Sequence, residues 1–151
     1  MTDDITVDCM IDEDASKPLY AHEDDAGADL MSDGEYTLRP GGRMLVGTGV
    51  RIGLPVGKLA WVTPRSGLAA KHGVTVLNAP GLIDHGYHGE LKVCLVNLDP
   101  VEEFHIHKGD RIAQLVIQDC DHAVFRNVES FEESSRGESG FGSTGVSGKA
   151  A

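Results

Sequence analysis

The feature that most constrains the fold is a series of short β-prone runs separated by strong turn signals, among them "RPGGR", "PVGK" and "KGD". Short strands at nearly regular spacing are typical of an all-β sandwich or barrel. The alternation of strands and helices found in doubly wound folds is missing. We expect strands within residues 5–11, 35–38, 44–54, 59–63, 74–79, 90–100, 103–107, 111–120 and 122–128.

One segment, "SGLAAKHG", interrupts the β pattern. Ser66 stands in an N-cap position, residues 68–71 are helix formers, and Gly73 stands where a C-terminal stop belongs. The segment predicts a single short helix.

Composition limits the class of protein. A chain of 151 residues, 40% of them hydrophobic, fits one domain with its own core. The net charge of −11 argues against general binding to nucleic acid or to anionic membranes. No apolar run is long enough to span a bilayer, and the acidic N-terminus lacks the pattern of a signal peptide, so we expect a cytoplasmic location.

The glycine-rich segment "RGESGFGSTG" (136–145) resembles a Walker A phosphate loop, but Ser143 stands in place of the lysine. A Walker loop is also followed by a helix, and "VSGKAA" is too short and too rich in glycine to form one. A disordered tail is the ordinary alternative. Arg136 and Phe141 are the residues that leave a binding role open.

Four internal stretches place polar residues beside glycine bends: "DAGADL" (25–30), "PRSGLAAKHG" (64–73), "NAPGLIDHGYHGELKV" (78–93) and "GDRIAQLVIQ" (109–118). Arg65 directly precedes the expected helix, where a guanidinium and free N–H groups could bind one anion. Taken singly, each of these residues also has an ordinary structural role, which is the more common one for such short motifs: Arg65 as a surface residue, Asp29 and Asp84 as turn residues, and Gln114 as a solvent-facing residue of an edge strand.

A structural zinc site is a further alternative. His105 and His107 would share one face of a strand, but no third ligand has a sensible spacing to this pair. The acidic residues and histidines of 84–90 lie among glycines, which also argues against zinc.

Taken in order, "AGADL", "PRSGLAAKHG", "NAPGLIDHGYHGELKV", "GDRIAQLVIQ" and "RGESGFGSTG" resemble the five sequence motifs of the trimeric dUTP diphosphatases (dUTPases). The match runs from about Asp25 to Gly145. The resemblance implies an all-β jelly roll, or β-clip barrel, with one short helix, assembled as a homotrimer with active sites at subunit interfaces. It divides the chain into a body, 1–133, and a flexible glycine-rich arm, 134–151, that closes over a neighbouring subunit's site.

The resemblance also implies that dUTP is hydrolysed to dUMP and pyrophosphate, which limits uracil in DNA and supplies dUMP for dTMP synthesis. Asp84 would be the base that activates water. Asp29 would support Mg²⁺ through metal-bound water, while the substrate phosphates hold the metal. Tyr87 would exclude a ribose 2′-hydroxyl, Phe141 would stack on uracil, and Arg136 would add positive charge. The implied substrate-binding residues are Arg65, Ser66, Gly67, Asn78, Gly81, Leu82, Ile83, Asp84, Tyr87, Lys92, Gln114, Arg136, Phe141, Gly142 and Ser143.

Two alternatives remain at this point. dCTP deaminase, or a bifunctional relative, shares the fold and relies on a glutamate, for which Glu90 is a candidate. A jelly-roll module that binds nucleotides without catalysis is the second alternative, although it would be expected to lack Asp84 or the tail.

Overall fold

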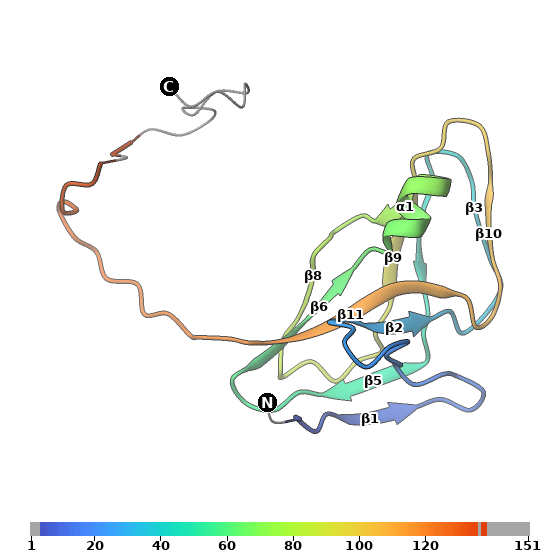
Figure 1. Cartoon of the computed structure of the whole chain (residues 1–151), viewed down its shortest axis with the longest axis horizontal. Helices are drawn as coiled ribbons and strands as arrows, with labels where there is room; N and C mark the ends of the chain where they lie inside the picture. Colours follow the sequence, from blue (N-terminus) through green and yellow to red (C-terminus); the bar gives the residue numbers. More distant parts are fainter. Residues whose placement is uncertain (1–3, 136, 139–151) are drawn as a thin grey trace.

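A computed structural model describes residues 4–135, 137 and 138. Within these residues the chain forms eleven short strands and one helix, which confirms the all-β prediction (Figure 1). The elements are β1 (Asp8–Ile11), β2 (Ala28–Met31), β3 (Tyr36–Leu38), β4 (Arg43–Val46), β5 (Val50–Gly53), β6 (Lys58–Thr63), α1 (Ser66–His72), β7 (Val74–Val76), β8 (Gly81–Ile83), β9 (Val93–Asn97), β10 (Phe104–Ile106) and β11 (Arg111–Asp119).

The strands pair antiparallel in small sheets that enclose one core. The largest sheet has the order β2-β11-β6-β8, and a second has the order β4-β9-β7. The pairs β1-β5 and β3-β10 complete the described structure. Burial alternates along β5 and along the second half of β6, as expected for strands with one face against a core. Leu30, Leu38, Val46, Leu95 and Ile106 are among the fully buried residues of that core.

Two strands, β2 and β8, were not predicted, and the predicted strand over 44–54 is two strands separated by residues 47–49. Strands β2 and β8 are only four and three residues long. Their sequences contain no extended β-prone run. Pairing with long neighbours stabilises them instead, because β2 pairs with β11 and β8 pairs with β6.

The helix α1 begins at Ser66 itself, one residue earlier than a Ser66 cap would place it. Arg65, with extended backbone angles, is the N-cap residue and Ser66 is the first helical residue, so the prediction of a Ser66 cap was wrong. No side chain caps this end. At the other end, Gly73 has φ 64° and its N–H bonds to the carbonyls of Leu68 and Ala69, which confirms the predicted stop.

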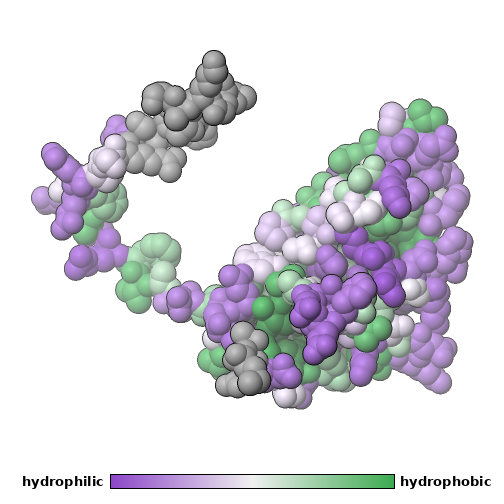
Figure 2. All heavy atoms as spheres, in the orientation of Figure 1, coloured by the Kyte–Doolittle hydropathy of each residue, from purple (hydrophilic) through white to green (hydrophobic). Residues whose placement is uncertain are grey.

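Residues 120–135 extend away from the body after β11 (Figure 1). Val124, Phe125 and Phe131 on this segment are more than 90% exposed, and Figure 2 shows apolar side chains along it. The strand predicted over 122–128 was wrong for the single chain. A strand needs a hydrogen-bonded partner, and this segment has left the sheet that would supply one. The division at 133/134 between body and arm stays a prediction.

The described part of the chain contains no helix that is long and apolar enough to cross a bilayer. The cytoplasmic location expected from the sequence stays a prediction.

Candidate active site

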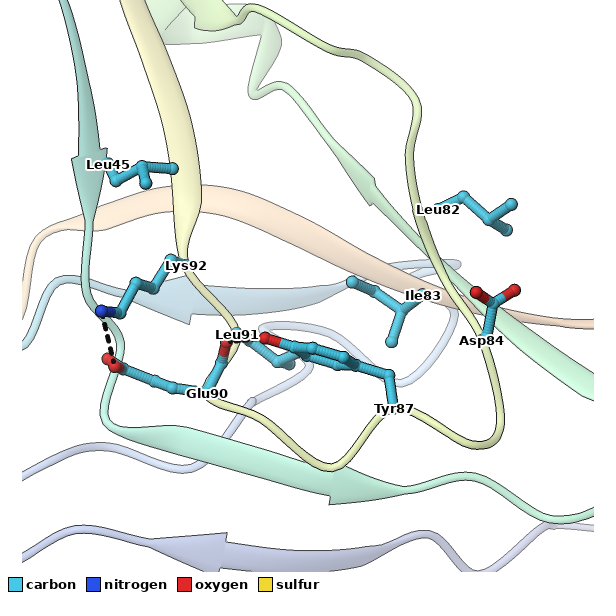
Figure 3. Close-up of a pocket in the computed structure, with 8 residues that line it drawn as sticks. All are labelled: Leu45, Leu82, Ile83, Asp84, Tyr87, Glu90, Leu91 and Lys92. Atoms are coloured by element: carbon cyan, nitrogen blue, oxygen red, sulfur yellow. Dashed lines mark hydrogen bonds and ion pairs between the residues drawn. The ribbon is translucent and has the colours of Figure 1, made fainter.

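A cavity of about 500 Å³ lies against the loop that connects β8 to β9 (Figure 3). Five sequence candidates line it together: Leu82, Ile83, Asp84, Tyr87 and Lys92. Leu45, Glu90 and Leu91 complete the lining and were not among the predicted substrate-binding residues. The wall therefore combines apolar side chains with two carboxylates, one ammonium group and one phenol, as in sites for small polar molecules.

Pairing of β8 with β6 sets the direction of the residues at one end of this cavity. Leu82 lies opposite Trp61 and is half exposed, while Gly81, opposite Val62, is buried. Asp84 follows directly after the strand and is exposed. Among the described residues, none donates a hydrogen bond to the Asp84 carboxylate, so both of its oxygens remain available to solvent or ligand.

Tyr87 crosses the middle of the cavity. Its ring lies between the end that carries Asp84 and the end that carries Glu90 and Lys92 (Figure 3). The phenol donates a hydrogen bond to the Glu90 carbonyl, with 2.9 Å between oxygens, and the Tyr87 N–H donates to the Asp84 carbonyl over 3.0 Å. A Cβ atom at Gly89 would lie 2.5 Å from the phenol oxygen, so the ring can occupy this position only beside a glycine.

Asn78 lies outside the lining of this cavity, at the start of the segment that leads into β8. A Cβ at Gly81 would approach the Asn78 amide nitrogen to 3.3 Å, so this side chain packs over Gly81. The structure thus brings Asn78 to the base of the β8 strand rather than to the tyrosine.

A second cluster of candidates forms where β2, β11 and β6 run side by side. Gln114 is directly opposite Asp29 on one side and Thr63 on the other. Arg65, two residues beyond Thr63, places its Nε 3.2 Å from the Asp29 Oδ1 atom. The alternatives of a turn role for Asp29 and an edge-strand role for Gln114 are wrong, because Asp29 is buried within β2 and Gln114 lies on a central strand.

Arg111 joins this cluster and was missed from the sequence. Its Nη1 lies 3.4 Å from Asp29 Oδ2, and its carbonyl accepts a hydrogen bond from Arg65 Nη1 over 3.2 Å. A β-bulge between Arg111 and Ala113 shifts the register there, and such bulges redirect side chains. The available signal was its position in "GDRIAQLVIQ", three residues before Gln114.

The Asp29 carboxylate is thus held between two guanidinium groups. Its Oδ1 atom is buried and has no hydrogen-bond partner among the described residues, because the Arg65 Nε contact has the distance of an ion pair without the alignment of a hydrogen bond. One acceptor site on this buried oxygen is therefore open to a donor from outside the chain.

The two clusters open into separate cavities within one chain. Arg65 and Arg111 line a cavity of about 380 Å³ that shares no lining residue with the cavity of Asp84 and Tyr87. Ser66 and Gly67 follow Arg65 as exposed residues of the first turn of α1. A single chain therefore presents two separate groups of candidates, one with an exposed carboxylate and one with guanidinium groups.

Four candidates of the tail, Arg136, Phe141, Gly142 and Ser143, lie outside the described residues. The structure gives no support to the zinc alternative. Within the described residues, no group of three or more potential metal-binding side chains lies together. The Nδ1 atom of His105 instead lies 3.1 Å from the Thr37 hydroxyl.

The family model for dUTPase matches residues 13–145, which include both groups of candidates and the four candidates of the tail. The chain belongs to the dUTPase family. It is 54% identical over 135 residues to the deoxyuridine 5′-triphosphate nucleotidohydrolase of Rhodococcus erythropolis strain PR4, covering 89% of this chain and 82% of that protein. To the protein of the same name from Bifidobacterium longum strain DJO10A it is 61% identical over 127 residues, covering 84% of this chain and 80% of the other.

Solved dUTPase structures also share the fold. A mutant dUTPase of Staphylococcus bacteriophage 80alpha with dUpNHpp superposes with a TM-score of 0.87 at 31% identity, covering 93% of this chain and 99% of the other. A mutant dUTPase from phage phi11 of S. aureus, described for its coordination of a structural Mg(II) ion, gives a TM-score of 0.78 at 27% identity, covering 85% and 100%.

Proposed function

We propose that this dUTPase family member hydrolyses dUTP to dUMP and pyrophosphate by attack of water on the α-phosphorus. The observation that carries the proposal is the exposed Asp84 carboxylate at one end of a cavity that is crossed by Tyr87. Membership of the family and relatives named deoxyuridine 5′-triphosphate nucleotidohydrolase support the choice of substrate. In the cell this reaction limits uracil incorporation into DNA and supplies dUMP for dTMP synthesis.

The cavity of Asp84 and Tyr87 is the nucleoside half of the proposed site. Backbone groups of residues 81–83 pair with uracil, and Asn78 fixes the hairpin that presents them. Cytosine offers the opposite donor and acceptor pattern and would leave buried groups unpaired, at a cost of about 1–3 kcal/mol each. Tyr87 packs against the deoxyribose where a 2′-hydroxyl would project, and Leu82, Ile83 and Lys92 complete the wall.

The cluster around Asp29 is the phosphate half. Arg65 donates to phosphate oxygens together with backbone N–H groups at Ser66 and Gly67, and Gln114 adds an amide donor. The ion pair with Asp29 keeps the Arg65 guanidinium at the cavity wall before substrate binds, which reduces the loss of side-chain entropy on binding. Arg136, Phe141, Gly142 and Ser143 are proposed from the sequence motif to close over the nucleotide.

Asp84 orients and deprotonates the attacking water. Geometry supports this role, because its carboxylate is exposed at the cavity and no described residue competes for it. The Glu90 carboxylate, the candidate for a deaminase role, is instead occupied by backbone N–H groups of Thr48 and Gly49. That occupation argues against a base role for Glu90.

The residues present suit an indirect Mg²⁺ site. Mg²⁺ keeps several water ligands and is usually held by one or two carboxylates together with substrate phosphates. The orphaned, buried Oδ1 atom of Asp29 can accept a hydrogen bond from a metal-bound water, whereas the described residues offer no cage of ligands. When bound, Mg²⁺ neutralises charge on the phosphate chain.

A homotrimer with shared sites is part of the proposal. The two half-sites open into different cavities of one chain, so a complete site can form where the first cavity of one subunit faces the second cavity of another. The exposed aromatic residues on 120–135 support contact with a neighbouring subunit, because isolated chains rarely expose such side chains.

The first experiment measures pyrophosphate release with Mg²⁺ from dUTP, dCTP, dTTP and UTP in parallel, and follows ammonia in the dCTP reaction. We expect rapid release from dUTP and at least about a hundredfold less from the other three. Ammonia from dCTP would move the protein to the deaminase class. Binding of dUTP without any pyrophosphate would identify a non-catalytic module.

A further inference from the structure

Glu90 lines the nucleoside cavity, but its carboxylate serves the turn between β4 and β5. Its Oε1 atom accepts hydrogen bonds from the N–H groups of Thr48, over 3.2 Å, and Gly49, over 3.1 Å. Its Oε2 atom lies 3.5 Å from Lys92 Nζ, and the side chain is only 18% exposed (Figure 3). A carboxylate that accepts two adjacent backbone N–H groups is a charge-assisted and directional anchor.

The turn that Glu90 contacts is itself firmly held. Residues 47–50 are all buried. The Thr48 hydroxyl donates to the Leu91 carbonyl over 2.6 Å, and the Leu91 N–H donates to the Val50 carbonyl over 2.8 Å. The turn is therefore joined to residues 90 and 91 by side-chain and backbone bonds together.

A second set of bonds fixes the same turn from the other side. The Gly47 N–H donates to the Tyr36 phenol over 3.2 Å, and that phenol donates to Asp33 over 2.7 Å. The hydrogen bond to Asp33 raises the pKa of Tyr36, so the phenol remains a donor at neutral pH. The turn is consequently a fixed reference point rather than a loop that could follow Glu90.

The main chain of Glu90 connects the turn at residues 47–49 to the Tyr87 ring in the cavity. Its carbonyl is the acceptor for the Tyr87 phenol, and the ring packs against Gly89, where an added Cβ would lie 2.5 Å from the phenol oxygen. If the Glu90 side chain lost its hold on the turn, the bonds of Leu91 would remain, but the Glu90 carbonyl and the tyrosine ring bonded to it would lose their own attachment to the turn.

We infer that Glu90 is a positioning residue that sets the selection of deoxyribose over ribose, by anchoring the Tyr87 ring to the turn at residues 47–49. The inference rests on the proposed function, since it assigns Tyr87 to the sugar. Selection against a small added hydroxyl requires a wall that does not yield, and the chain of contacts from the turn through Glu90 to Tyr87 provides one.

Three substitutions separate the hydrogen bonds of Glu90 from its charge. Glu90→Gln keeps an oxygen that can accept both N–H groups, Glu90→Leu removes the acceptor, and Glu90→Asp keeps the charge but shortens the reach. Glu103→Leu is the matched control, because Glu103 is exposed and lies away from the nucleoside cavity. The measured quantity is the ratio of kcat/KM for dUTP to kcat/KM for UTP.

We expect Glu90→Leu and Glu90→Asp to lower this ratio about tenfold or more, mainly through faster use of UTP and a raised KM for dUTP, while Glu90→Gln and Glu103→Leu stay within about threefold of wild type. If Glu90→Leu does not fold, Glu90→Asp decides alone. An unchanged ratio in the variants that lose the anchor would overturn the inference. An equal fall in Glu90→Gln would assign the effect to charge and would also overturn it.

Hydrogen exchange of the amides of 85–91 provides a readout that is independent of turnover. We expect about tenfold faster exchange in Glu90→Leu and Glu90→Asp than in the wild type or in Glu103→Leu. If the wild-type protein hydrolysed no dUTP, the proposed function and the sugar role of Tyr87 would both be wrong. Hydrogen exchange of residues 85–91 would still show whether Glu90 anchors this loop.

Discussion

At the scale of single residues, the proposed chemistry depends most on Asp84. Asp84→Asn keeps the size of the side chain and removes its ability to take a proton. We expect kcat for dUTP to fall about a thousandfold while the Kd of dUTP changes little, because a general base contributes to the transition state and not to binding. Single-turnover kinetics and calorimetric titration measure the two quantities.

Asp119→Asn is the matched control for this substitution, since Asp119 is an exposed carboxylate at the far end of β11 that contacts Lys58. We expect it to leave both kcat and Kd unchanged. Turnover within about tenfold of wild type in Asp84→Asn would remove Asp84 from the base role.

The residues proposed to contact the ligand could be predicted from the sequence better than the residues that hold them in place. Asp84 and Tyr87 stand in a turn-rich stretch that places polar residues beside glycines, which made them candidates from the sequence. The structure places both at one cavity. The contact of Glu90 with Thr48 joins residues 42 positions apart, and no local pattern marks it. Arg111 stands in the quoted stretch "GDRIAQLVIQ", but it was missed because its pairing with Asp29 follows from the register of β11 on β2.

At the scale of elements, the C-terminal end of α1 was predicted correctly from a local backbone signal, whereas its N-cap was placed one residue too late. Gly73 ends α1 because a left-handed residue is required there, and this is visible in the sequence. Strands β2 and β8, and the missing strand at 122–128, were misjudged because a strand exists only beside another strand. Three residues of β8 suffice next to β6, whereas seven β-prone residues beyond β11 remain single in this chain.

The end of α1 provides a test of how tightly that helix is placed. Gly73 and Gly57 both have positive φ, 64° and 79°, but only at Gly73 would a Cβ meet other backbone, at 3.0 Å from the Asp99 nitrogen. We expect Gly57→Ala to lower the free energy of unfolding by about 1 kcal/mol, the cost of a left-handed alanine. Gly73→Ala should lose about 2–3 kcal/mol, because the collision adds to that cost.

Urea unfolding at one protein concentration measures this difference between the two glycine variants. Equal midpoints would mean that the segment at Asp99 moves aside freely, and that α1, which follows Arg65, is not held rigidly by its C-terminal end.

At the scale of the whole molecule, the distribution of charge and the division of the site are linked. A net charge of −11 would repel a triphosphate unless cations are concentrated where it binds. Arg65 and Arg111 supply that concentration in one cavity, while Asp84 lies in another. The separation keeps the Asp84 carboxylate from pairing with these arginines of its own chain, and under the proposed function the complete site requires a second subunit.

This requirement predicts that two inactive variants restore activity when they share a trimer. Asp84→Asn chains keep an intact Arg65, and Arg65→Ala chains keep an intact Asp84. If each site takes Asp84 from one subunit and Arg65 from another, random mixing in equal amounts gives intact pairs at about one site in four. We therefore expect co-refolded mixtures to recover about a quarter of wild-type kcat, with each variant refolded alone as the control and size-exclusion chromatography confirming trimers. Recovery of no activity in mixed trimers would place both residues of a site in one chain, and the two cavities would then have to be joined by a rearrangement within the subunit.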